Sequence, residues 1–477
     1  MGDKLYVGLH NHSVFSIADA TSPIADIARR CKELGMDAIA ITEHGSLSSW
    51  LQFKTACKKY NIKGILGLEA YFVDDVNEVY VLNEEISVLQ ESIKKLNKSK
   101  TKADKKAVTK LNDNLLALQE KRNILKKYNH IILLAKNYEG CMNLIKIHNA
   151  SVIDGIYYKP RISWATLEQY KGGIIASTAC LGGRISKLLA NDDIITAKNA
   201  VARFKNIFGQ DNFYLELQLH DIPLQTEVNA KMIKLSEATN TPCIINLDSH
   251  FLDEGGHRSR ELIRKLDKDP DESDNDVHLK DLFIKNEDMI LTSWTKYMPG
   301  VSPQILADAI LNNRKIADSI ENFELDTSLK FPIFDTHGAT QEDFLIKNAW
   351  KGLKAKNLHT NPVYLERLKL ELNTVNPLGF ASYFNIVADI IKDAKTYQSV
   401  GCGRGSVSGS LLAYVLGITE IDPIKFELYF ERFLSKEKSI QPPTFGFTNI
   451  EQITLDYKKI TDEIKHDHTC ICNHAYS

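Results

Sequence analysis

The chain has 477 residues, a length that predicts about two to four domains rather than one. Its apolar content of 43% and charged content of 25% are typical of globular proteins. The formal net charge of −2 neither indicates nor excludes a nucleic-acid partner, because a local basic groove can lie within a near-neutral total.

Export and membrane insertion are not indicated. Residues Met1–Tyr6 lack the basic-then-apolar layout of a signal peptide. The longest apolar runs, such as Ile131–Ala135, are too short to span a bilayer. Eight cysteines scattered over this length do not form a disulfide framework. We therefore expect a reduced, cytoplasmic protein with no membrane partner.

The N-terminal part of the chain alternates between strand and helix patterns. Ser22-Pro23 is typical of a helix start, and Gly35 of the helix end. The other expected elements are a strand at Leu5–Leu9, a buried strand at Ala38–Thr42, a helix at Leu47–Tyr60 and a strand at Ile62–Tyr71. This alternation predicts parallel strands joined by crossover helices, an α/β layout.

Residues 83–127 interrupt this pattern. They are rich in Lys, Glu, Asn and Leu, contain no proline or glycine, and hold two runs of apolar residues at helical spacing. A polar segment at Asn97–Thr101 separates the two runs. We expect an antiparallel helical hairpin inserted into the domain, acting as a solvated spacer or as a contact for DNA or a partner.

Strand patterns then return before a change in character. The expected strands are His130–Ala135, Gly173–Ser177, Phe213–Leu217 and Cys243–Asn246. Asp267–Asp276 is acidic and rich in turn residues, so we expect a domain boundary between it and about Leu291. A mostly helical section follows over Pro303–Asn373, and glycine-rich Gly401–Gly409 leads into an apolar helix at Ser410–Leu416.

Metal-ligating side chains recur at the ends of these strands. His10 and His12 follow the first strand, and Asp248 and His250 follow the last. In extended backbone, residues i and i+2 point the same way, so each pair can face one ion. The same residue types beside other strands are Asp19, His44, Glu69, His130 and Cys180. Barrel-like α/β folds build their sites at the carboxyl ends of strands, so the set predicts a metal cluster there.

The motifs around these residues resemble the polymerase-and-histidinol-phosphatase (PHP) domain, in the version fused to bacterial replicative polymerases. They are Leu9–Ser13, Thr42–Gly45, Gly67–Tyr71, His130–Gly140, Tyr157–Ile162, Ala179–Gly183 and Asp248–His250. The resemblance implies a distorted β/α barrel. It also implies nine metal ligands at His10, His12, Asp19, His44, Glu69, His130, Cys180, Asp248 and His250. One departure is Glu43, where the family has aspartate, which bears on local geometry beside the ligands.

The ligand types and the resemblance together indicate a chemistry. Imidazoles, carboxylates and a thiolate suit zinc, with manganese or iron as alternatives at oxygen-rich positions, in a multinuclear cluster. Clustered dications supply hydroxide near neutral pH. The resemblance implies a phosphodiester substrate at the 3′ end of DNA, and hence 3′–5′ exonucleolytic proofreading. Lys159 and Arg161 are candidate contacts to DNA phosphates, and the alternative is that they are solvated charges of a loop.

Gly401–Ser410 carries a second signal. Glycines allow close backbone approach to phosphate, the following helix N-terminus adds partial positive charge, and Arg404 can fork onto phosphate oxygens. With Leu411–Pro423 and Phe430–Leu434, this segment resembles the palm of C-family bacterial DNA polymerases, the DNA polymerase III alpha subunits. The resemblance implies that Arg404, Gly405 and Ser406 bind the incoming nucleotide.

The palm resemblance stops after residue 438. The family continues into a Pro-Asp-x-Asp motif whose aspartates hold the catalytic magnesium pair, whereas Ser439–Phe445 stands here without a carboxylate. We expect no polymerase catalytic aspartates, and magnesium only with a complementing polymerase half. The tail at 439–477 is unassigned, and its His466-x-His468 and Cys470-x-Cys472 pairs have spacing unlike structural zinc sites.

We therefore interpret the chain as an N-terminal portion of a polymerase III alpha-like protein of DNA replication. The expected domains are a PHP phosphoesterase at 1–275 with its charged insert at 83–127, an incomplete palm at 285–438 and the tail at 439–477. The expected partners are the primer 3′ end, the remaining polymerase fragment and other replisome subunits. The alternatives are a stand-alone PHP phosphatase, which would not need the palm-like region, and a non-catalytic scaffold fragment of a split polymerase.

Overall fold

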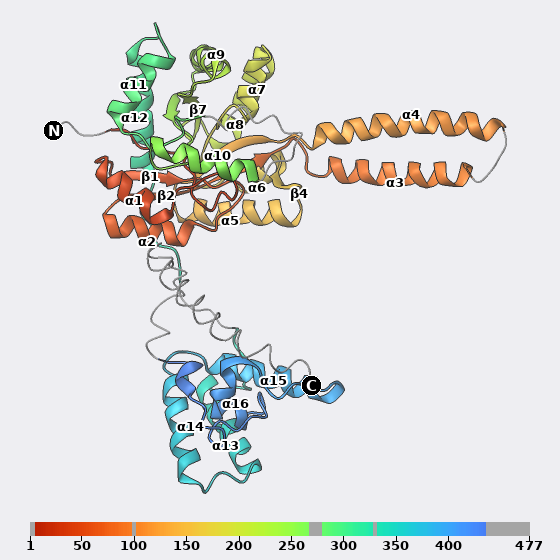
Figure 1. Cartoon of the computed structure of the whole chain (residues 1–477), viewed down its shortest axis with the longest axis vertical. Coiled ribbons are helices and arrows are strands. Elements are labelled where there is room, and N and C mark those ends of the chain that lie inside the picture. The colour runs from red at the N-terminus through yellow and green to blue at the C-terminus, as the bar shows by residue number, and fades with distance from the viewer. Residues whose placement is uncertain (1–4, 98–101, 267–278, 328–331, 436–477) are drawn as a thin grey trace, which may run out of the picture. The chain divides into compact units, whose positions relative to one another are not determined.

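The computed structural model of the chain describes residues 5–97, 102–266, 279–327 and 332–435. The chain forms two compact units, Met1–Leu325 and Asp326–Ser477 (Figure 1). None of the helices in the described ranges is both long enough and apolar enough to cross a membrane. The acidic break at 267–276 and the tail at 439–477 lie outside the described residues, together with the two metal-like pairs of that tail.

The first unit is a mixed α/β fold built on a curled sheet. The described strands are β1 Ala38–Ile41, β2 Lys63–Phe72, β3 Asn129–Ala135, β4 Ile156–Tyr157, β5 Lys159–Ile162, β6 Ile174–Ser177, β7 Phe213–Gln218 and β8 Cys243–Asn246. Their order is β4-β5-β2-β3-β6-β7-β8, and β1 pairs with the first half of β2. The strands predicted from the sequence after residue 37 are confirmed to within two residues at their ends.

The N-terminal segment closes this sheet. Gly8 forms a parallel bridge with Ile39 beside β1, and Asn11 forms one with Ser249 just after β8. The His12 amide donates to the Ser249 carbonyl at 2.8 Å. The segment that was expected as the first strand therefore bridges β1 on one side and the residues after β8 on the other. This closure accounts for the barrel-like character predicted from the resemblance.

Alternate residues of the strands face two different cores. One core, inside the curl, contains Ala38, Ala40, Ile65, Ile132 and Ile175. The neighbouring residues in sequence belong to a larger core against the surrounding helices. Because both faces of the strands are covered, the strands are continuous apolar runs in the sequence.

Strand β3 runs antiparallel to both β2 and β6, which corrects the prediction of parallel strands throughout. The reason is the insert between β2 and β3. The chain leaves the end of β2 at Phe72 and returns beside it at Asn129, which is the register partner of Phe72. An insert that returns to its starting edge cannot act as a crossover, so the next strand runs in the opposite direction.

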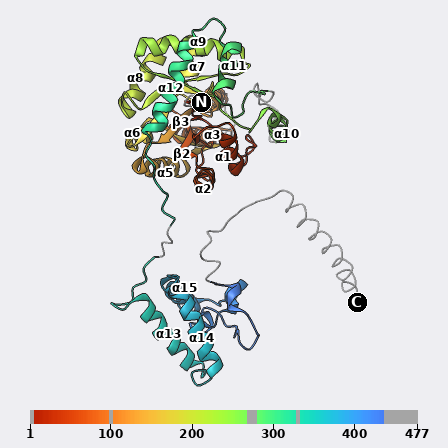
Figure 2. The ribbon, with the colours of Figure 1, turned by 90° about the vertical axis from the view of Figure 1, so that its left-hand side faces the viewer.

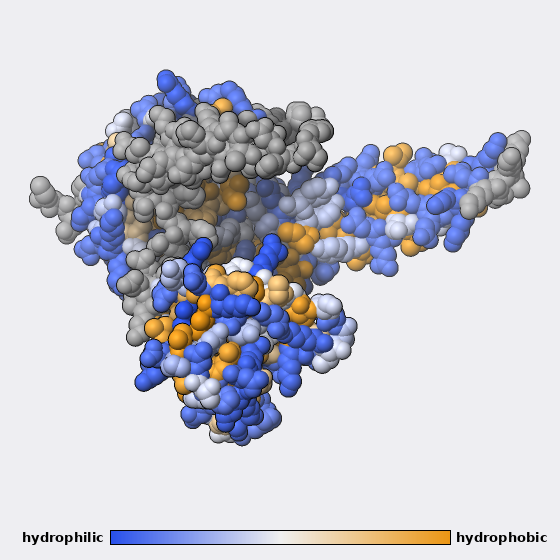
Figure 3. All heavy atoms as spheres, turned by 60° about the horizontal axis from the view of Figure 1, so that its bottom comes forward, coloured by the Kyte–Doolittle hydropathy of each residue, from blue (hydrophilic) through white to orange (hydrophobic). Residues whose placement is uncertain are grey.

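That insert is the predicted helical hairpin, formed by α3 Glu78–Leu96 and α4 Lys102–Leu125 (Figure 1). It projects from the first unit as an arm. Val79, Leu82 and Ile86 are buried on α3, whereas apolar side chains such as Val88 and Leu116 stay exposed (Figure 3). At its base, the Arg161 guanidinium donates to the Leu125 carbonyl at 3.2 Å, which fixes the returning helix to β5.

The remaining helices of the first unit surround the sheet (Figure 2). They are α1 Ile24–Glu33, α2 Trp50–Tyr60, α5 Tyr138–Ile153, α6 Trp164–Gln169, α7 Arg184–Ala190, α8 Ile194–Phe208, α9 Pro223–Thr239, α10 His257–Leu266 after the 3₁₀ turn η1 Glu254–Gly256, α11 Glu287–Tyr297 and α12 Pro303–Ser319. The Gly35 position after α1 has φ +70°, the left-handed value that ends a helix at low cost in glycine.

Helices α11 and α12 belong to the first unit, not to the second. Ile316 and Ala317 of α12 pack into the inner core. Buried Asn313 donates to the carbonyls of Val7 and Ile245, each at 2.8 Å, and accepts from the Ile245 amide at 2.9 Å. The boundary between the two units therefore lies near Leu325. It was expected before about Leu291, and it lies later because α12 covers one end of the curled sheet.

The second unit contains helices, turns and loops and no strand among its described residues. Its elements are α13 Gln341–Ala355, α14 Pro362–Val375, α15 Ala381–Tyr397, α16 Leu411–Val415 and the 3₁₀ turns η2 Gly405–Gly409 and η3 Phe430–Arg432. A core that includes Leu345, Leu368, Phe384 and Leu412 joins them. The mostly helical character expected after Pro303 is confirmed. The expected palm remnant is represented here by helices and turns.

The Asn313 bridge gives a stability prediction. Asn313→Ala removes four buried hydrogen bonds and leaves backbone groups of Val7 and Ile245 unpaired, so the free energy of unfolding should fall by about 2–3 kcal/mol. Urea denaturation followed by circular dichroism measures this change. Lys315→Ala, on an exposed position of the same helix, is the matched control and should change stability little. Equal stability of both variants would contradict the bridging role.

Candidate metal centre

The nine residues predicted as metal ligands come together at one end of the curled sheet. They arrive from the N-terminal segment, from β2 and β3, and from the loops that follow β1, β6 and β8. His130 opens β3, whereas the other strands contribute from their carboxyl ends. The antiparallel direction of β3 explains this, since its first residues lie beside the last residues of β2.

Glu69 lies at the centre of the cluster and is fully buried. Its Oε1 is 2.7 Å from His130 Nδ1 and 3.6 Å from His10 Nε2. Its Oε2 is 2.5 Å from His44 Nδ1 and 3.3 Å from His12 Nε2. One carboxylate on β2 therefore faces four imidazoles from three other parts of the chain.

Asp248 forms a second meeting point. Its Oδ1 is 3.0 Å from His10 Nε2 and 3.1 Å from His12 Nε2, so the two histidines of the His-x-His pair face the same atom. Asp248 has φ +51°, a left-handed backbone conformation that costs a non-glycine residue energy. Ala179, next to Cys180, shares this conformation with φ +60°. The strained backbone thus lies directly beside proposed ligands.

Asp19 completes the cluster on its open side. Its Oδ2 is 3.1 Å from His44 Nε2 and 3.3 Å from His250 Nε2. Its Oδ1 accepts from Arg260 at 2.6 Å and lies 3.3 Å from Arg264, both on α10. The sequence analysis did not identify these arginines, which lie some 240 residues from Asp19 and carry no motif.

Cys180 lies beside Glu69 and His130. Its Sγ is 3.5 Å from His130 Nδ1 and 3.9 Å from Glu69 Oε1. Burial, with added effect from the charges of Glu69 and Asp248, raises the pKa of the thiol well above its ordinary value. Because thiolate is the form that binds metal, a cation bound here would have to displace this proton.

The carboxylates of the cluster are held in their charged form. Burial alone would raise the pKa of Glu69, but the imidazoles of His130, His44 and His10 outweigh it and hold that pKa well below its ordinary value. The same balance applies to Asp248, where burial is outweighed by His10 and His250. The carboxylates therefore stay ionised, which is the form that binds a cation.

Six buried polar atoms in this cluster make no hydrogen bond of acceptable geometry among the described residues, although several lie within ion-pair distance of one another. They are His10 Nε2, His12 Nε2, His44 Nδ1, Glu69 Oε2, Asp248 Oδ1 and His250 Nε2. Buried polar atoms normally have partners, and leaving them without one is costly. Within the cluster of nine predicted ligands, three sets of three residues offer ligand atoms within 4.8 Å of one another. The donor set fits one or more transition-metal ions.

Other side chains orient the imidazoles. His10 Nδ1 is 2.7 Å from Glu216 Oε1, and Glu216 is itself held by Ser177 Oγ at 2.8 Å and Gln218 Nε2 at 2.8 Å. An acceptor at Nδ1 fixes the proton there, so that Nε2 presents its lone pair to the cluster. The sequence analysis missed Glu216. The available signal was a charged residue inside an otherwise buried strand.

Glu43 has a comparable role for His12. Its carboxylate accepts from the Ser13 amide at 3.1 Å, from the Ser13 hydroxyl, and from Ser16 Oγ at 2.5 Å. Ser16 Oγ in turn lies 2.9 Å from His12 Nδ1. The glutamate that departs from the family pattern is therefore fully buried and acts on His12 through Ser16.

Comparison with known proteins shows what this chain is related to. A family model described as the PHP domain matches residues 8–220, and one described as the bacterial DNA polymerase III alpha NTPase domain matches residues 343–445. The DNA polymerase III subunit alpha of Aquifex aeolicus is 34% identical over 452 residues, and that of Borreliella burgdorferi is 32% identical over 448 residues. This chain is a homologue of the DNA polymerase III alpha subunits.

The alignments cover most of this chain but only part of each relative. Each alignment covers 92% of this chain but 36% and 34% of the two relatives, so the chain spans about a third of their length. Among solved structures, one from Bifidobacterium adolescentis, assigned as a metal-dependent phosphoesterase, is 16% identical. It covers 51% of this chain and 87% of that chain, with a TM-score of 0.26.

The polymerase-like segment places Arg404, Gly405 and Ser406 on the surface, at the start of η2. The helix that was expected to offer them a positive N-terminus is only the five residues of α16. Its first amides are already occupied, because the buried Glu371 carboxylate accepts from Leu411 N at 2.9 Å and Leu412 N at 2.8 Å. The prediction that the helix dipole contributes to phosphate binding is therefore wrong. Nucleotide binding by Arg404, Gly405 and Ser406 stays a proposal.

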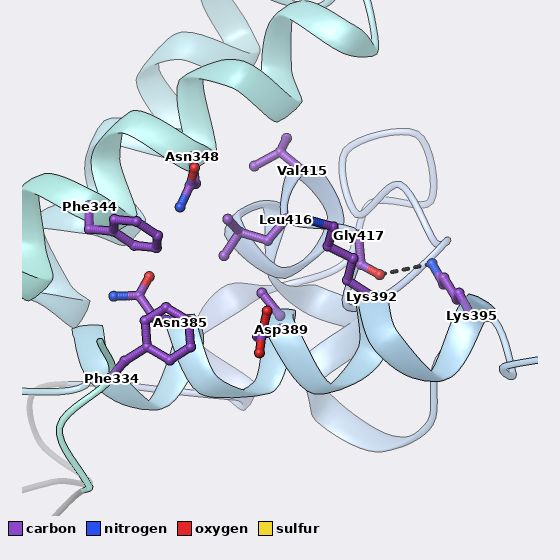
Figure 4. A pocket seen from close by; sticks show the side chains of 11 residues that line it. Phe334, Phe344, Asn348, Asn385, Asp389, Lys392, Lys395, Val415, Leu416 and Gly417 are labelled. Atoms are coloured by element: carbon purple, nitrogen blue, oxygen red, sulfur yellow. Dashed lines mark hydrogen bonds between the residues drawn. The ribbon is translucent and has the colours of Figure 1, made fainter. Parts of the chain in front are cut away.

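The second unit also contains a hollow of about 440 Å³ between α13, α15 and the end of α16 (Figure 4). Phe334, Phe344 and Leu416 give it apolar walls, and Asp389 and Lys392 line it as charged groups. The three residues proposed to bind a nucleotide do not line it. The hollow and the glycine-rich turn are therefore separate features of this unit.

The contact between Glu216 and His10 gives a prediction about metal affinity. Glu216→Gln keeps the shape of the side chain but weakens its hold on the Nδ1 proton, so affinity for zinc or manganese should fall by about 10- to 100-fold. Competition with a chromogenic chelator measures the affinity. Glu237→Gln, on the exposed face of α9, is the matched control. Unchanged affinity in Glu216→Gln would exclude the orienting role.

Proposed function

We propose that the first unit hydrolyses phosphodiester bonds at the 3′ end of single-stranded DNA, as a proofreading 3′–5′ exonuclease dependent on bound metal. The observation that carries this proposal is the set of six buried ligand atoms around Glu69, Asp248 and Asp19 that make no hydrogen bond of acceptable geometry among the described residues. The relation to DNA polymerase III alpha subunits supports DNA as the substrate.

The ligands proposed are His10, His12, Asp19, His44, Glu69, His130, Cys180, Asp248 and His250. The mixture of imidazole, carboxylate and thiol favours zinc, with manganese or iron at the positions richer in oxygen. When bound, such ions lower the pKa of a coordinated water and neutralise phosphoryl oxygens.

The chain's own residues supply positioning. Glu216 and Ser16 set the direction in which His10 and His12 present their Nε2 atoms. Arg260 and Arg264 balance the charge of Asp19 and hold it at the open side of the cluster. A rigid, pre-oriented donor set lowers the reorganisation needed when a charged substrate enters.

The test compares two classes of substrate under identical zinc or manganese conditions. Single-stranded DNA labelled at its 5′ end should be shortened stepwise from the 3′ end, faster than a fully paired end, because a paired end must first unstack. Asp248→Asn should reduce the rate by roughly 100-fold or more, since it removes charge where two imidazoles meet. Asp253→Asn, nearby in sequence but outside the cluster, is the control.

The stand-alone phosphatase is the alternative that this comparison addresses. If histidinol phosphate is turned over while DNA stays intact, the exonuclease proposal is wrong. The non-catalytic scaffold is the other alternative, and it predicts no hydrolysis of either substrate with metal bound. The similarity of residues 343–445 to the polymerase family favours the DNA-directed role over the small-molecule phosphatase.

For the second unit, we propose a nucleotide-binding role for Arg404, Gly405 and Ser406 that needs a complementing polymerase portion. Residues 439–445, where the resemblance places the catalytic aspartates, contain no carboxylate. Without them a magnesium pair cannot be held for nucleotidyl transfer. A complementing portion and other replisome subunits are the proposed protein partners.

This proposal predicts that the purified chain does not extend a primer. A primed template with magnesium and all four deoxynucleotides should show no incorporation above that of a buffer blank. The unmodified polymerase III alpha subunit of Aquifex aeolicus serves as the positive control under the same conditions. Magnesium-dependent extension by this chain would mean that other carboxylates replace the missing pair.

A further inference from the structure

The turn between β4 and β5 presents one aromatic side chain to solvent. Tyr157 pairs with Lys159, so Tyr158 alone forms the tip of this hairpin. Tyr158 is 74% exposed, and its φ of +62° lies in the left-handed region. Glycine or asparagine adopts this conformation at lower cost than a bulky residue. The Tyr158 ring is therefore held in solvent by an unfavourable backbone conformation, and it adds little to the hydrophobic core.

This turn is packed against the metal centre. Gly45, which follows His44, has φ +56°, and a Cβ there would lie 2.9 Å from both Pro160 Cγ and Tyr71 Cε2. The Tyr71 ring lies 6.3 Å from the His44 ring, centroid to centroid. Lys159 Nζ lies 5.7 Å from the Tyr71 ring. The position of the turn is therefore fixed relative to the cluster by close contacts through Gly45 and Tyr71.

One lysine lies over the exposed ring, and a second follows Tyr158 in the chain. Lys126, at the returning end of the helical arm, has its Nζ 5.1 Å from the Tyr158 ring, and Lys159 is the next residue in the chain. Both lysines are exposed. Within the described ranges, neither is ion-paired with a carboxylate. An exposed aromatic ring with lysines nearby that no carboxylate pairs is a combination that binds single-stranded nucleic acid, since every base has a π face and every linkage a negative phosphate.

Arg161, which the sequence analysis grouped with Lys159 as a phosphate contact, has a different role. It is 2% exposed, and its guanidinium donates to the carbonyls of Gly155 and Leu125, each at 3.2 Å. It also stacks on Tyr157 at 5.0 Å. Arg161 therefore supports the turn from behind and connects it to the end of α4, which brings Lys126 to Tyr158.

We propose that Tyr158 is a stacking platform for a base of single-stranded DNA near the end being hydrolysed, with Lys126 and Lys159 on the adjacent phosphates. This inference rests on the proposed exonuclease function and specifies how that site recognises its substrate. It assigns the strained turn a positioning role rather than a catalytic one.

The experiment uses the full chain and two separate readouts. Fluorescence anisotropy with a labelled single-stranded oligonucleotide measures DNA binding without requiring hydrolysis. Hydrolysis of bis(p-nitrophenyl) phosphate with added zinc or manganese measures the metal centre without a base to stack. If wild-type protein cleaves neither DNA nor this small diester, the proposed function fails, while the binding measurement still decides the platform.

Three substitutions at one position separate the possible roles of the ring. Tyr158→Ala and Tyr158→Gly should weaken oligonucleotide binding by about 5- to 100-fold, the range for loss of one stacked base. Tyr158→Phe keeps the ring and should bind within about twofold of wild type. Hydrolysis of the small diester should be unchanged in all three. Glycine suits the left-handed turn, so Tyr158→Gly should not lower the melting temperature and serves as the control for folding.

The contribution of the two lysines is tested by the salt dependence of DNA binding. Lys126→Gln and Lys159→Gln should each reduce the slope of log affinity against log salt concentration by about 0.7 for a single strand. Wild-type DNA affinity in both Tyr158→Ala and Tyr158→Gly would overturn the proposal. That result is expected if this surface binds a protein instead of DNA. An equal loss of small-diester hydrolysis in these variants would also overturn it, because the turn would then support the metal centre itself.

Discussion

The structure of the first unit depends on one buried carboxylate. Glu69 sits on the inner face of β2, and its Oε2 makes no hydrogen bond of acceptable geometry among the described residues. Burying such a charge is strongly unfavourable unless cations compensate it. The imidazoles of His130, His44 and His10 supply part of that compensation, and the pKa of Glu69 falls accordingly. The fold gathers these groups because strand ends and loops from the whole unit converge on the same end of the sheet.

The direction of β3 follows from this requirement as much as from chain topology. With the helical arm returning to the edge it left, the first residues of β3 meet the last residues of β2. His130 thereby reaches Glu69 although it begins its strand rather than ends it. A crossover connection would have placed His130 at the opposite end of the sheet. The projecting arm and the composition of the centre are therefore linked.

Much of this arrangement could be predicted because the buried strands are apolar runs in the sequence and the ligand residues follow those runs. The spacing of His10 and His12 was enough to expect both imidazoles on one side. The supporting residues could not be predicted in this way. Arg260 reaches Asp19, and Asn313 reaches Val7, across most of the chain, and neither lies in a motif. The boundary near Leu325 was missed because the acidic segment at 267–276 resembles a linker, while α12 returns to cover the sheet.

Closure of the sheet by the N-terminal segment has a consequence for the order of events during synthesis. His10 and His12 emerge from the ribosome early, and their segment can pair with β1 soon afterwards, but the Ser249 carbonyl that accepts from the His12 amide is made much later. At roughly 5–20 residues per second, the interval is on the order of tens of seconds. During that time the two imidazoles lack Asp248, the carboxylate that both of them face. The unit therefore selects among competing metals only when most of it has been synthesised. The reason is that Asp248 is the last of the carboxylate ligands to be made.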